Sequence, residues 1–374
     1  MKVLIDMSFI RSYELKKSIP LYGFRLLQGI QELHINDVFL LVNGDLHNYF
    51  QENYPQFHTI PIRISPCWHR INWRFQDWLY DIIYRWKILC TKYDIVLTIN
   101  EYTFRTTFRT RKKKISVIHD LKDLSIQKDS HLSRSRNFYR KLIESADVVV
   151  AISEYTKQVI LSHYDVSDNK IKVIYNSIKL AEVSKRPQVI MDGMKYILYV
   201  NTLLEYKNPQ TLLRAFNAVK DNIEENLVFV GKVTEYWENV LLPFIKHNGL
   251  EHRVIRLQDL SDEELRYLYE HASVFVTSSL HEGFGYTPIE AAMCCCPVIC
   301  TKCEALPETT MMLLNYYEPA GDYYELGNKI IEVINSPRNN DSLLEVSEKF
   351  RQKYLPKIQA SQFFSLIGIL LRED

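Results

Sequence analysis

The segment from Ser278 to Ile299 holds the residues whose types and spacing are best suited to chemistry. It begins at the end of a predicted strand, passes through Gly283 and Gly285, and enters a predicted helix. A glycine-containing turn at a helix N-terminus gathers unpaired backbone N–H groups and the positive end of the helix dipole, which together suit a phosphate. Glu282 and Glu290 flank the turn, and carboxylates accept hydrogen bonds from hydroxyl groups. The segment therefore suits a ligand with a phosphate between a sugar and a ribose, and a helix capped by structural glycines is the alternative that it leaves open.

The elements that must position this turn form an α/β pattern of short apolar runs and longer amphipathic stretches. The runs are continuous in Val and Ile, as expected of parallel strands buried on both faces. The predicted strands of the first half are Lys2–Asp6, Val38–Val42, Asp94–Ile99, Ile115–Ile118, Val148–Ile152 and Lys172–Tyr175. Those of the second half are Tyr196–Val200, Leu227–Val230, Val254–Leu257, Val274–Thr277 and Pro297–Cys300. Helical stretches between them predict βαβ units and two parallel sheets.

Length and local signals indicate how these elements are grouped. A chain of 374 residues exceeds one comfortable core, and the polar segment Ala181–Lys195 marks a break, so we expect domains over residues 1–184 and 185–345. Leu344–Leu371 has helical spacing with no strand after it. A capping box from Ser261 to Glu264 and Pro288 in a first turn mark two helix starts.

Composition limits the partners and the compartment. Lys plus Arg number 46 against 45 for Asp plus Glu, so a net charge of +1 gives no reason to expect nucleic acid. The first residues lack a signal-peptide pattern, no long apolar run predicts a spanning helix, and the seven cysteines are interpreted as reduced thiols. We expect a cytoplasmic protein whose membrane contact, if any, is peripheral. The spacing of Cys296, Cys300 and Cys303 matches an iron–sulfur site but crosses a buried strand, so no metal site is predicted.

The segment beginning at Glu282, EGFGYTPIEAAM followed by PVI, resembles the E-x7-E signature of the retaining family 4 (group 1) glycosyltransferases. Other segments resemble motifs of that family in the expected order, and they are His119-Asp-Leu, Ala151–Lys157, Val173–Asn176, Tyr196–Asn208, Leu227–Gly231 and Leu306–Glu308 with Pro319. The resemblance covers about residues 1 to 335. It implies the GT-B fold, in which two Rossmann-like domains face each other across a cleft and a C-terminal helix, here residues 346–374, crosses back to the first domain.

The resemblance also implies the reaction and the roles of individual residues. The donor would be a nucleoside-diphosphate sugar, and transfer would retain the anomeric configuration. His119, Glu282 and Lys207 would be catalytic, with His119 facing the donor sugar and Lys207 contacting the diphosphate; Glu290 would hold the ribose. The full donor-binding set would be Asn201, Thr202, Lys207, Leu257, Gln258, Leu260, Glu282, Gly283, Phe284, Gly285, Tyr286, Thr287 and Glu290.

Departure of the sugar leaves charge on the diphosphate, which Lys207 and the helix N-terminus near Tyr286–Thr287 would stabilise in place of a metal ion. No cofactor is therefore expected. The chain departs from the family where relatives carry a second cation, since it has Thr202 and Tyr206 there. Asn201, Ser177 and Cys295 stand where relatives use glycine.

A window rich in tryptophan and arginine precedes the third predicted strand. Its residues at helical spacing predict a helix docked on the first sheet, through the stripe Ile71, Phe75, Trp78, Ile82, Trp86 and Leu89. Trp73, Tyr80 and Tyr84 fall off that stripe. With Arg105, Arg109 and Arg111–Lys114 they would form a basic and aromatic surface for anionic lipid.

We therefore expect a glycosyltransferase that acts on a glycan or lipid-linked acceptor in bacterial surface polysaccharide assembly, such as lipopolysaccharide, O-antigen or capsule. A non-catalytic GT-B subunit that binds a nucleotide or a partner enzyme is the alternative. The missing cations and glycines favour it, whereas the presence of both glutamates, His119 and Lys207 disfavours it. A dehydrogenase is disfavoured because no G-x-G-x-x-G follows the first strand. The sequence leaves open the base (GDP, UDP or TDP), the sugar and the acceptor.

Overall fold

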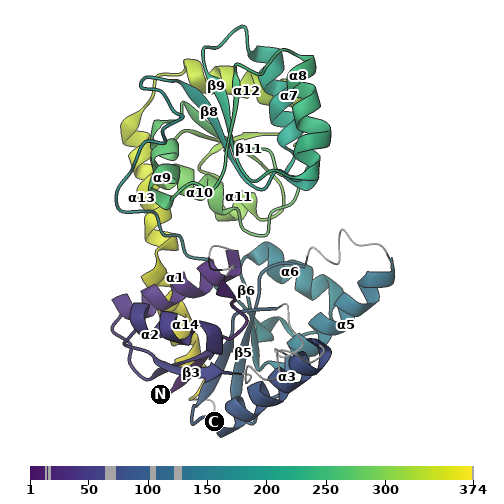
Figure 1. Ribbon diagram of the computed structural model, residues 1–374, viewed down its shortest axis with the longest axis vertical. Coiled ribbons are helices and arrows are strands. Elements are labelled where there is room, and N and C mark those ends of the chain that lie inside the picture. Colours follow the sequence, from purple (N-terminus) through teal and green to yellow (C-terminus); the bar gives the residue numbers. More distant parts are fainter. Residues whose placement is uncertain (13–14, 16–17, 64–72, 102–106, 122–128, 373–374) are drawn as a thin grey trace. The chain divides into compact units, whose positions relative to one another are not determined.

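The computed structural model describes the chain outside residues 13–14, 16–17, 64–72, 102–106, 122–128 and 373–374, and the side chains of 73–74 and 129–134 are also outside the description. The chain divides into two compact units (Figure 1). The first comprises Met1–Ser177 with Leu355–Asp374, and the second comprises Ile178–Tyr354. The expected boundaries, 184–185 and 345–346, lie inside the second unit. One reason is that Arg266 donates hydrogen bonds to the carbonyl groups of Ala181 and Glu182.

The first unit is built on a seven-stranded sheet in the order β3-β2-β1-β4-β5-β6-β7, with every neighbouring pair parallel. Its strands are β1 (Val3–Met7), β2 (Val38–Asn43), β3 (His58–Ile62), β4 (Ile95–Thr98), β5 (Lys113–Ile118), β6 (Val148–Ala151) and β7 (Ile171–Val173). Its helices are α1 (Ser18–Glu32), α2 (His47–Asn53), α3 (Trp73–Cys90), α5 (Asp129–Ser145), α6 (Glu154–His163) and α14 (Pro356–Leu370). Buried Val, Leu and Ile side chains of the central strands form the core, as the continuous apolar runs predict.

The second unit has a six-stranded parallel sheet in the order β10-β9-β8-β11-β12-β13. Its strands are β8 (Tyr196–Val200), β9 (Asn226–Val230), β10 (Val254–Leu257), β11 (Val274–Thr277), β12 (Val298–Thr301) and β13 (Asn315–Tyr317). Its helices are α7 (Pro209–Val219), α8 (Leu242–His247), α9 (Asp262–His271), α10 (Tyr286–Met293), α11 (Leu306–Thr309), α12 (Tyr323–Asn335) and α13 (Asn340–Tyr354). Two parallel α/β sheets of this kind are the fold class that the sequence predicts, and the capping box at Ser261 is present.

Each predicted strand coincides with an observed strand to within two residues at its ends. The two observed strands without a prediction, β3 and β13, each lie at one edge of a sheet. β3 contains Pro61, which edge strands tolerate because one side of them needs no hydrogen bond. β13 is short and polar, and only Tyr317 is buried in it. β3 and β13 each bury a single residue and lack a continuous Val and Ile run, so the signal that identifies the central strands is absent from them.

The C-terminal stretch is two helices where the sequence predicts one. α13 ends at Tyr354, and α14 begins at Pro356, whose ring cannot continue a preceding helix. α13 belongs to the second unit and packs on α10. α14 belongs to the first unit and packs on α1. A Cβ atom on Gly29 would overlap the backbone carbonyl of Pro356, so glycine permits this close contact between α1 and α14. The predicted return of the chain to the first domain is thus made by α14.

The orientation predicted for α3 is wrong. The face of this helix that packs on the first sheet holds Tyr80, Tyr84 and Ile88, which are buried. The predicted packing stripe is exposed at Trp78, Ile82, Trp86 and Leu89. Tyr80 and Tyr84 can be buried because their hydroxyl groups donate to the carbonyl of Ser8 (2.9 Å) and to Asp6 Oδ2 (2.8 Å). Ile71, Arg105 and the side chain of Trp73 lie outside the described residues.

Candidate functional site

The loop between β11 and α10 has the backbone geometry of a ligand-binding turn. Gly285 caps α10 with φ 87°, a left-handed conformation that favours glycine, and a Cβ atom there would overlap Leu306. The loop is fastened to the segment after β12 at three points. Glu282 N donates to Glu304 Oε2 (2.6 Å), Ala305 N donates to the Glu282 carbonyl (3.2 Å), and the Thr309 hydroxyl donates to the Phe284 carbonyl (2.6 Å). The start of α10 is therefore held in place by its neighbouring loop.

The Glu282 carboxylate joins two loops of the second unit, the one after β8 and its own loop after β11. Its Oε1 atom accepts hydrogen bonds from Lys207 Nζ (2.5 Å), Ser279 Oγ (2.9 Å) and Asn201 Nδ2 (3.4 Å). The Lys207 and Glu282 side chains are only 8% and 13% exposed, so this ion pair is well shielded from water. Lys207 Nζ also lies 3.4 Å from the His281 carbonyl. Two of the predicted catalytic groups are thus in direct contact.

The turn that follows β8 positions Lys207. The residue ends a 3-10 turn (Glu205–Lys207), and Asn208 after it has φ 53°. The Tyr199 hydroxyl, inside the core, donates to the Lys207 carbonyl at 2.8 Å. Burial raises the pKa of Tyr199 well above its usual value, and the Glu282 carboxylate adds to the effect. The phenol therefore remains a donor at neutral pH and fixes the backbone that carries the ammonium group.

Glu290 lies on α10, and its carboxylate has a buried phenol as a partner. Tyr269 Oη donates to Glu290 Oε2 at 3.2 Å. The pKa of Tyr269 is raised well above its usual value, mainly by burial and then by the Glu290 carboxylate. Glu290 is itself half-buried, on the helix that the glycine turn opens. Tyr269 therefore orients a carboxylate that is partly accessible to a ligand.

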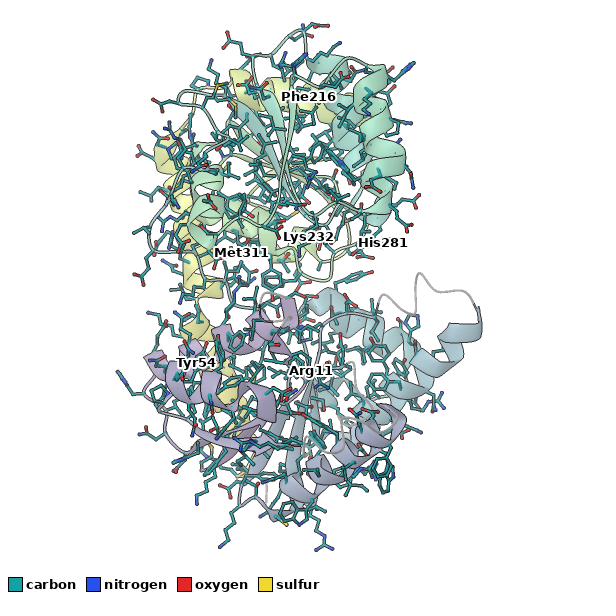
Figure 2. All side chains as sticks on the ribbon, viewed as in Figure 1. Arg11, Tyr54, Phe216, Lys232, His281 and Met311 are labelled. Atoms are coloured by element: carbon teal, nitrogen blue, oxygen red, sulfur yellow. The ribbon has the colours of Figure 1, made fainter. Side chains whose placement is uncertain are left out.

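The remaining predicted donor contacts follow other strands of the same sheet. Asn201 and Thr202 follow β8, and Thr202 N donates to Asn201 Oδ1 (2.9 Å). Leu257 ends β10 and is buried, whereas Gln258 is exposed and accepts from Arg256 Nη1 (2.8 Å). Leu260, which is half-buried, precedes the capping box that opens α9. Figure 2 shows His281 and Lys232, which follow β11 and β9, at the same end of the second unit, while Phe216 lies toward its other end.

The glycine turn itself carries two aromatic residues. Phe284 is buried, with ring centroids 5.1 Å from Tyr286 and 5.4 Å from Tyr354. Tyr286 and Thr287, at the first positions of α10, are half-buried, and so is Gly283. Phe284 therefore anchors the turn in the core while the helix start remains partly accessible.

His119 belongs to the first unit, where it follows β5. Its ring is almost buried, makes an edge contact with Tyr22 at 4.8 Å, and has Nε2 2.9 Å from the Ile99 carbonyl. Burial lowers the pKa of His119, against opposing contributions from the Ile99 carbonyl and Asp120. The imidazole is therefore neutral at pH 7, with Nε2 donating its proton to the carbonyl.

Sequence reasoning missed two carboxylates that hold these loops. Glu101 Oε2 accepts from His119 N (2.6 Å) and its Oε1 accepts from Asp120 N (3.3 Å). Glu304 accepts from Glu282 N, and its Oε1 lies 2.8 Å from His281 Nδ1. Each follows a buried strand by a few residues, and a carboxylate in that position is the signal that could have found them. Ser279 and Tyr269 were also missed.

In the part of the chain that the structure describes, no group of three or more His, Cys, Asp or Glu residues is placed to hold a metal ion. None of the described helices is long and apolar enough to cross a membrane.

Comparisons with known proteins agree with this architecture. The family model for group 1 glycosyl transferases matches residues 181–353, and that for Glycosyltransferase Family 4 matches residues 24–182. The chain is 24% identical to O-antigen chain mannosyltransferase B of Escherichia coli over 53% of this chain and 55% of that protein. It is 26% identical to O-antigen chain mannosyltransferase RfbU of Salmonella typhimurium over 80% and 82% of the two chains. The chain spans about half or less of the length of the first curated relatives that it matches.

Among solved structures, the Anabaena protein HepE in complex with UDP and glucose has a TM-score of 0.73 to this chain. The two share 15% identity, and the match covers 98% of this chain and 99% of that one. At this identity the likeness shows a common fold.

Proposed function

The chain belongs to the group 1, family 4 glycosyltransferases of the GT-B fold, and from this premise we propose that it moves a sugar from a nucleoside-diphosphate sugar to a glycan or lipid-linked acceptor with retention. The observation that carries the proposal is the shielded Lys207–Glu282 ion pair beside the glycine turn that opens α10. A cation, a carboxylate and a helix N-terminus in one place suit a sugar joined to a pyrophosphate.

In the proposed reaction the bond between the anomeric carbon and the diphosphate oxygen breaks, and its electron pair remains on the phosphate. The acceptor hydroxyl oxygen forms the new bond on the same face of the sugar and gives up its proton to the departing phosphate oxygen. Lys207 and the N–H groups at the start of α10 stabilise the charge that develops on the diphosphate. Glu282 accepts hydrogen bonds from the donor sugar, and Glu290 holds the ribose. These roles need no metal ion.

The relatives support a place in surface polysaccharide assembly. The two mannosyltransferases above act, by their names, on O-antigen chains, and the structural relative was solved with UDP. We therefore propose a hexose donor carried by GDP or UDP and a growing surface glycan as acceptor. A cytoplasmic site with a lipid-linked acceptor at the membrane surface fits that role.

A thermal-shift panel of UDP, GDP, TDP and ADP sugars tests donor binding. A ligand present at about 100 times its dissociation constant stabilises the folded state by roughly 2.7 kcal/mol, so the correct base stands out. Turnover with the selected donor then separates the two glutamates. Glu290→Ala should weaken nucleotide binding, Glu282→Ala should chiefly lower kcat, and Glu348→Ala, at an exposed position on α13, is the matched control. Unchanged kinetics in both site variants would refute the proposed site, and an inverted product anomer would refute retention.

A further inference from the structure

The outer face of α3 carries an apolar stripe that the fold leaves uncovered. Trp78, Trp86 and Leu89 are 56%, 57% and 57% exposed, and Ile82 is 42% exposed. These positions share one side of the helix because they recur at three- and four-residue spacing. The opposite side, with Tyr80, Tyr84 and Ile88, is the one that packs on the sheet. Figure 1 shows α3 along the outside of the first unit. Within the described part of the unit, the stripe is therefore exposed and does not pack on the sheet.

Two tryptophans on one exposed stripe indicate a binding surface. Single exposed apolar side chains are ordinary in proteins, but contiguous ones mark a site of contact with another molecule. Trp78 to Leu89 spans about 16 Å along the helix axis at ~1.5 Å per residue. Lys87 Nζ lies 5.4 Å from the Trp86 ring centroid, so a cation accompanies the stripe.

Basic residues lie beside the C-terminal half of α3. Phe108 packs against the buried side of the helix and lies under the Arg85 guanidinium, at 5.1 Å. The residues that follow Phe108 line a hollow of about 1000 Å³ at the amino ends of the strands, together with Lys170. The cations of this hollow are Arg109, Arg111, Lys112, Lys113 and Lys170. Phe108 thus places the start of the basic hollow beside the C-terminal half of α3.

The acidic groups around this surface are largely engaged. Asp81 pairs with Arg85 at 2.9 Å. Asp94 Oδ2 accepts from Lys2 N (2.8 Å), and Asp147 Oδ2 accepts from Lys114 N (2.7 Å). Glu144 also lines the hollow, and Asp77 is exposed on α3. The net charge of the side chains at the amino edge of the sheet remains positive, and Arg111 and Lys112 are both exposed.

We propose that the outer face of α3 and the basic hollow beside it form a docking surface for an anionic lipid membrane. Tryptophan prefers the boundary between headgroups and acyl chains, and basic side chains add attraction to anionic headgroups. The stripe would lie in that boundary while Arg111 and Lys112 contact headgroup phosphates. His119 lies at the opposite, carboxyl edge of the same sheet, so docking at the amino edge leaves that edge uncovered.

A second copy of the chain fits this surface less well. Two copies joined face to face would bring their basic hollows toward each other, and like charges repel. Four side chains are also few for an interface that buries ~800 Å² on each partner. Charge therefore favours an anionic lipid surface as the occupant.

Flotation of the whole chain with vesicles tests the proposal. The native chain should float with an equimolar mixture of phosphatidylglycerol and phosphatidylcholine and stay unbound with phosphatidylcholine alone. Trp78→Gln with Trp86→Gln should lower binding at least tenfold. Met191→Gln with Leu344→Gln removes equally exposed apolar groups from the second unit and should bind as the native chain does. Donor-induced thermal shifts that match the native chain would show that each variant is folded.

The charge contribution is tested by Arg111→Gln with Lys112→Gln. Losing two cations near the surface should lower the partition coefficient by about thirty-fold, and added salt should weaken binding of the native chain. The proposal is overturned if the tryptophan variant floats like the native chain, or if neutral and anionic vesicles bind equally. It is also overturned if the native chain is dimeric without vesicles and the tryptophan variant is monomeric, because a second copy then occupies the stripe. Donor turnover is a separate measurement, so failure here leaves the proposed reaction standing.

Discussion

Glu101 in the first unit and Glu304 in the second perform the same structural task in different ways. Each follows one strand of a parallel sheet and accepts a hydrogen bond of 2.6 Å from the backbone of the loop after the neighbouring strand. Glu101 is 1% exposed, and both its oxygens are bound to N–H groups of the loop that carries His119. The Glu304 side chain is 20% exposed, and it divides its oxygens between Glu282 N and the imidazole of His281.

The difference concerns how freely each loop can respond to a ligand. In the first unit the buried Glu101 carboxylate accepts two backbone hydrogen bonds and so fixes the loop. His119 Nε2 in that loop donates to the Ile99 carbonyl. In the second unit the predicted catalytic carboxylate, Glu282, is itself held by an ammonium group that a diphosphate can compete for. The first arrangement positions a neutral group, whereas the second holds a charge pair that the proposed diphosphate donor would rearrange.

The largest effect is expected from breaking the ion pair of the second unit. Lys207→Ala removes the cation proposed to stabilise the departing diphosphate and leaves a shielded carboxylate without its counterion. We expect kcat to fall by about 10² to 10³, measured as donor turnover at saturating donor. Lys302→Ala breaks the exposed pair with Glu318 (2.7 Å) and is the matched control, with kcat unchanged. Equal kcat values for the two variants would show that the Lys207–Glu282 ion pair does not contribute to turnover.

A smaller effect is expected from Glu101→Gln, which tests the first unit. The amide keeps one acceptor oxygen, but its NH2 group meets a backbone N–H, so one hydrogen bond becomes a repulsion. Loss of a charged partner by a buried donor costs about 2 kcal/mol, measured by denaturant unfolding. Glu52→Gln, on the surface of α2, should leave the free energy of unfolding unchanged. A Glu101 variant as stable as this control would show that the loop does not depend on the carboxylate.

Glu304→Gln should cost less, about 1 kcal/mol, because Glu304 is more exposed and has one backbone partner. The amide oxygen can still accept from Glu282 N. The Glu304→Gln substitution should mainly raise the KM for the donor, because the loop that Glu304 holds carries the glycine turn. If Glu304→Gln destabilises the chain more than Glu101→Gln does, the ranking of the two carboxylates is reversed.

The smallest effect concerns the end of α10. Cys295 follows this helix with φ 56°, a conformation in which a side chain is strained and glycine is not. We expect Cys295→Gly to stabilise the second unit by about 1 kcal/mol without a change in kcat, measured by thermal unfolding. Cys90→Gly, near the end of α3 at an exposed position, provides a contrasting control that should not stabilise. If Cys295→Gly destabilises the second unit, the inference that Cys295 has a strained backbone is wrong.

The sequence predicted the central strands and the glycine turn because their signals are local. Burial on both faces makes β1, β4 and β11 continuous apolar runs, and a helix start needs only its own residues. The face of α3 was mispredicted because both stripes are apolar or aromatic. The choice between them depends on Ser8 and Asp6, distant residues that receive the hydrogen bonds of Tyr80 and Tyr84.

The supporting carboxylates could not be assigned for a related reason. Glu101 matters because β4 lies beside β5, and Glu304 matters because β12 lies beside β11. Strand order is a property of the whole sheet, so no local pattern tells which loop a given carboxylate will reach. The contact between Lys207 and Glu282 likewise joins residues 75 positions apart.

The closing helix α14 has a consequence for how the chain is made. Unit two is one uninterrupted stretch, whereas unit one needs Leu355–Asp374 to complete it, with Pro356 seated against Gly29. During synthesis all of unit two is made before α14, so the face of α1 that packs on α14 stays uncovered until α14 is made. A ribosome-bound chain halted before Pro356 should therefore leave this face of α1 exposed, and α14 covers it once Pro356–Leu370 has emerged.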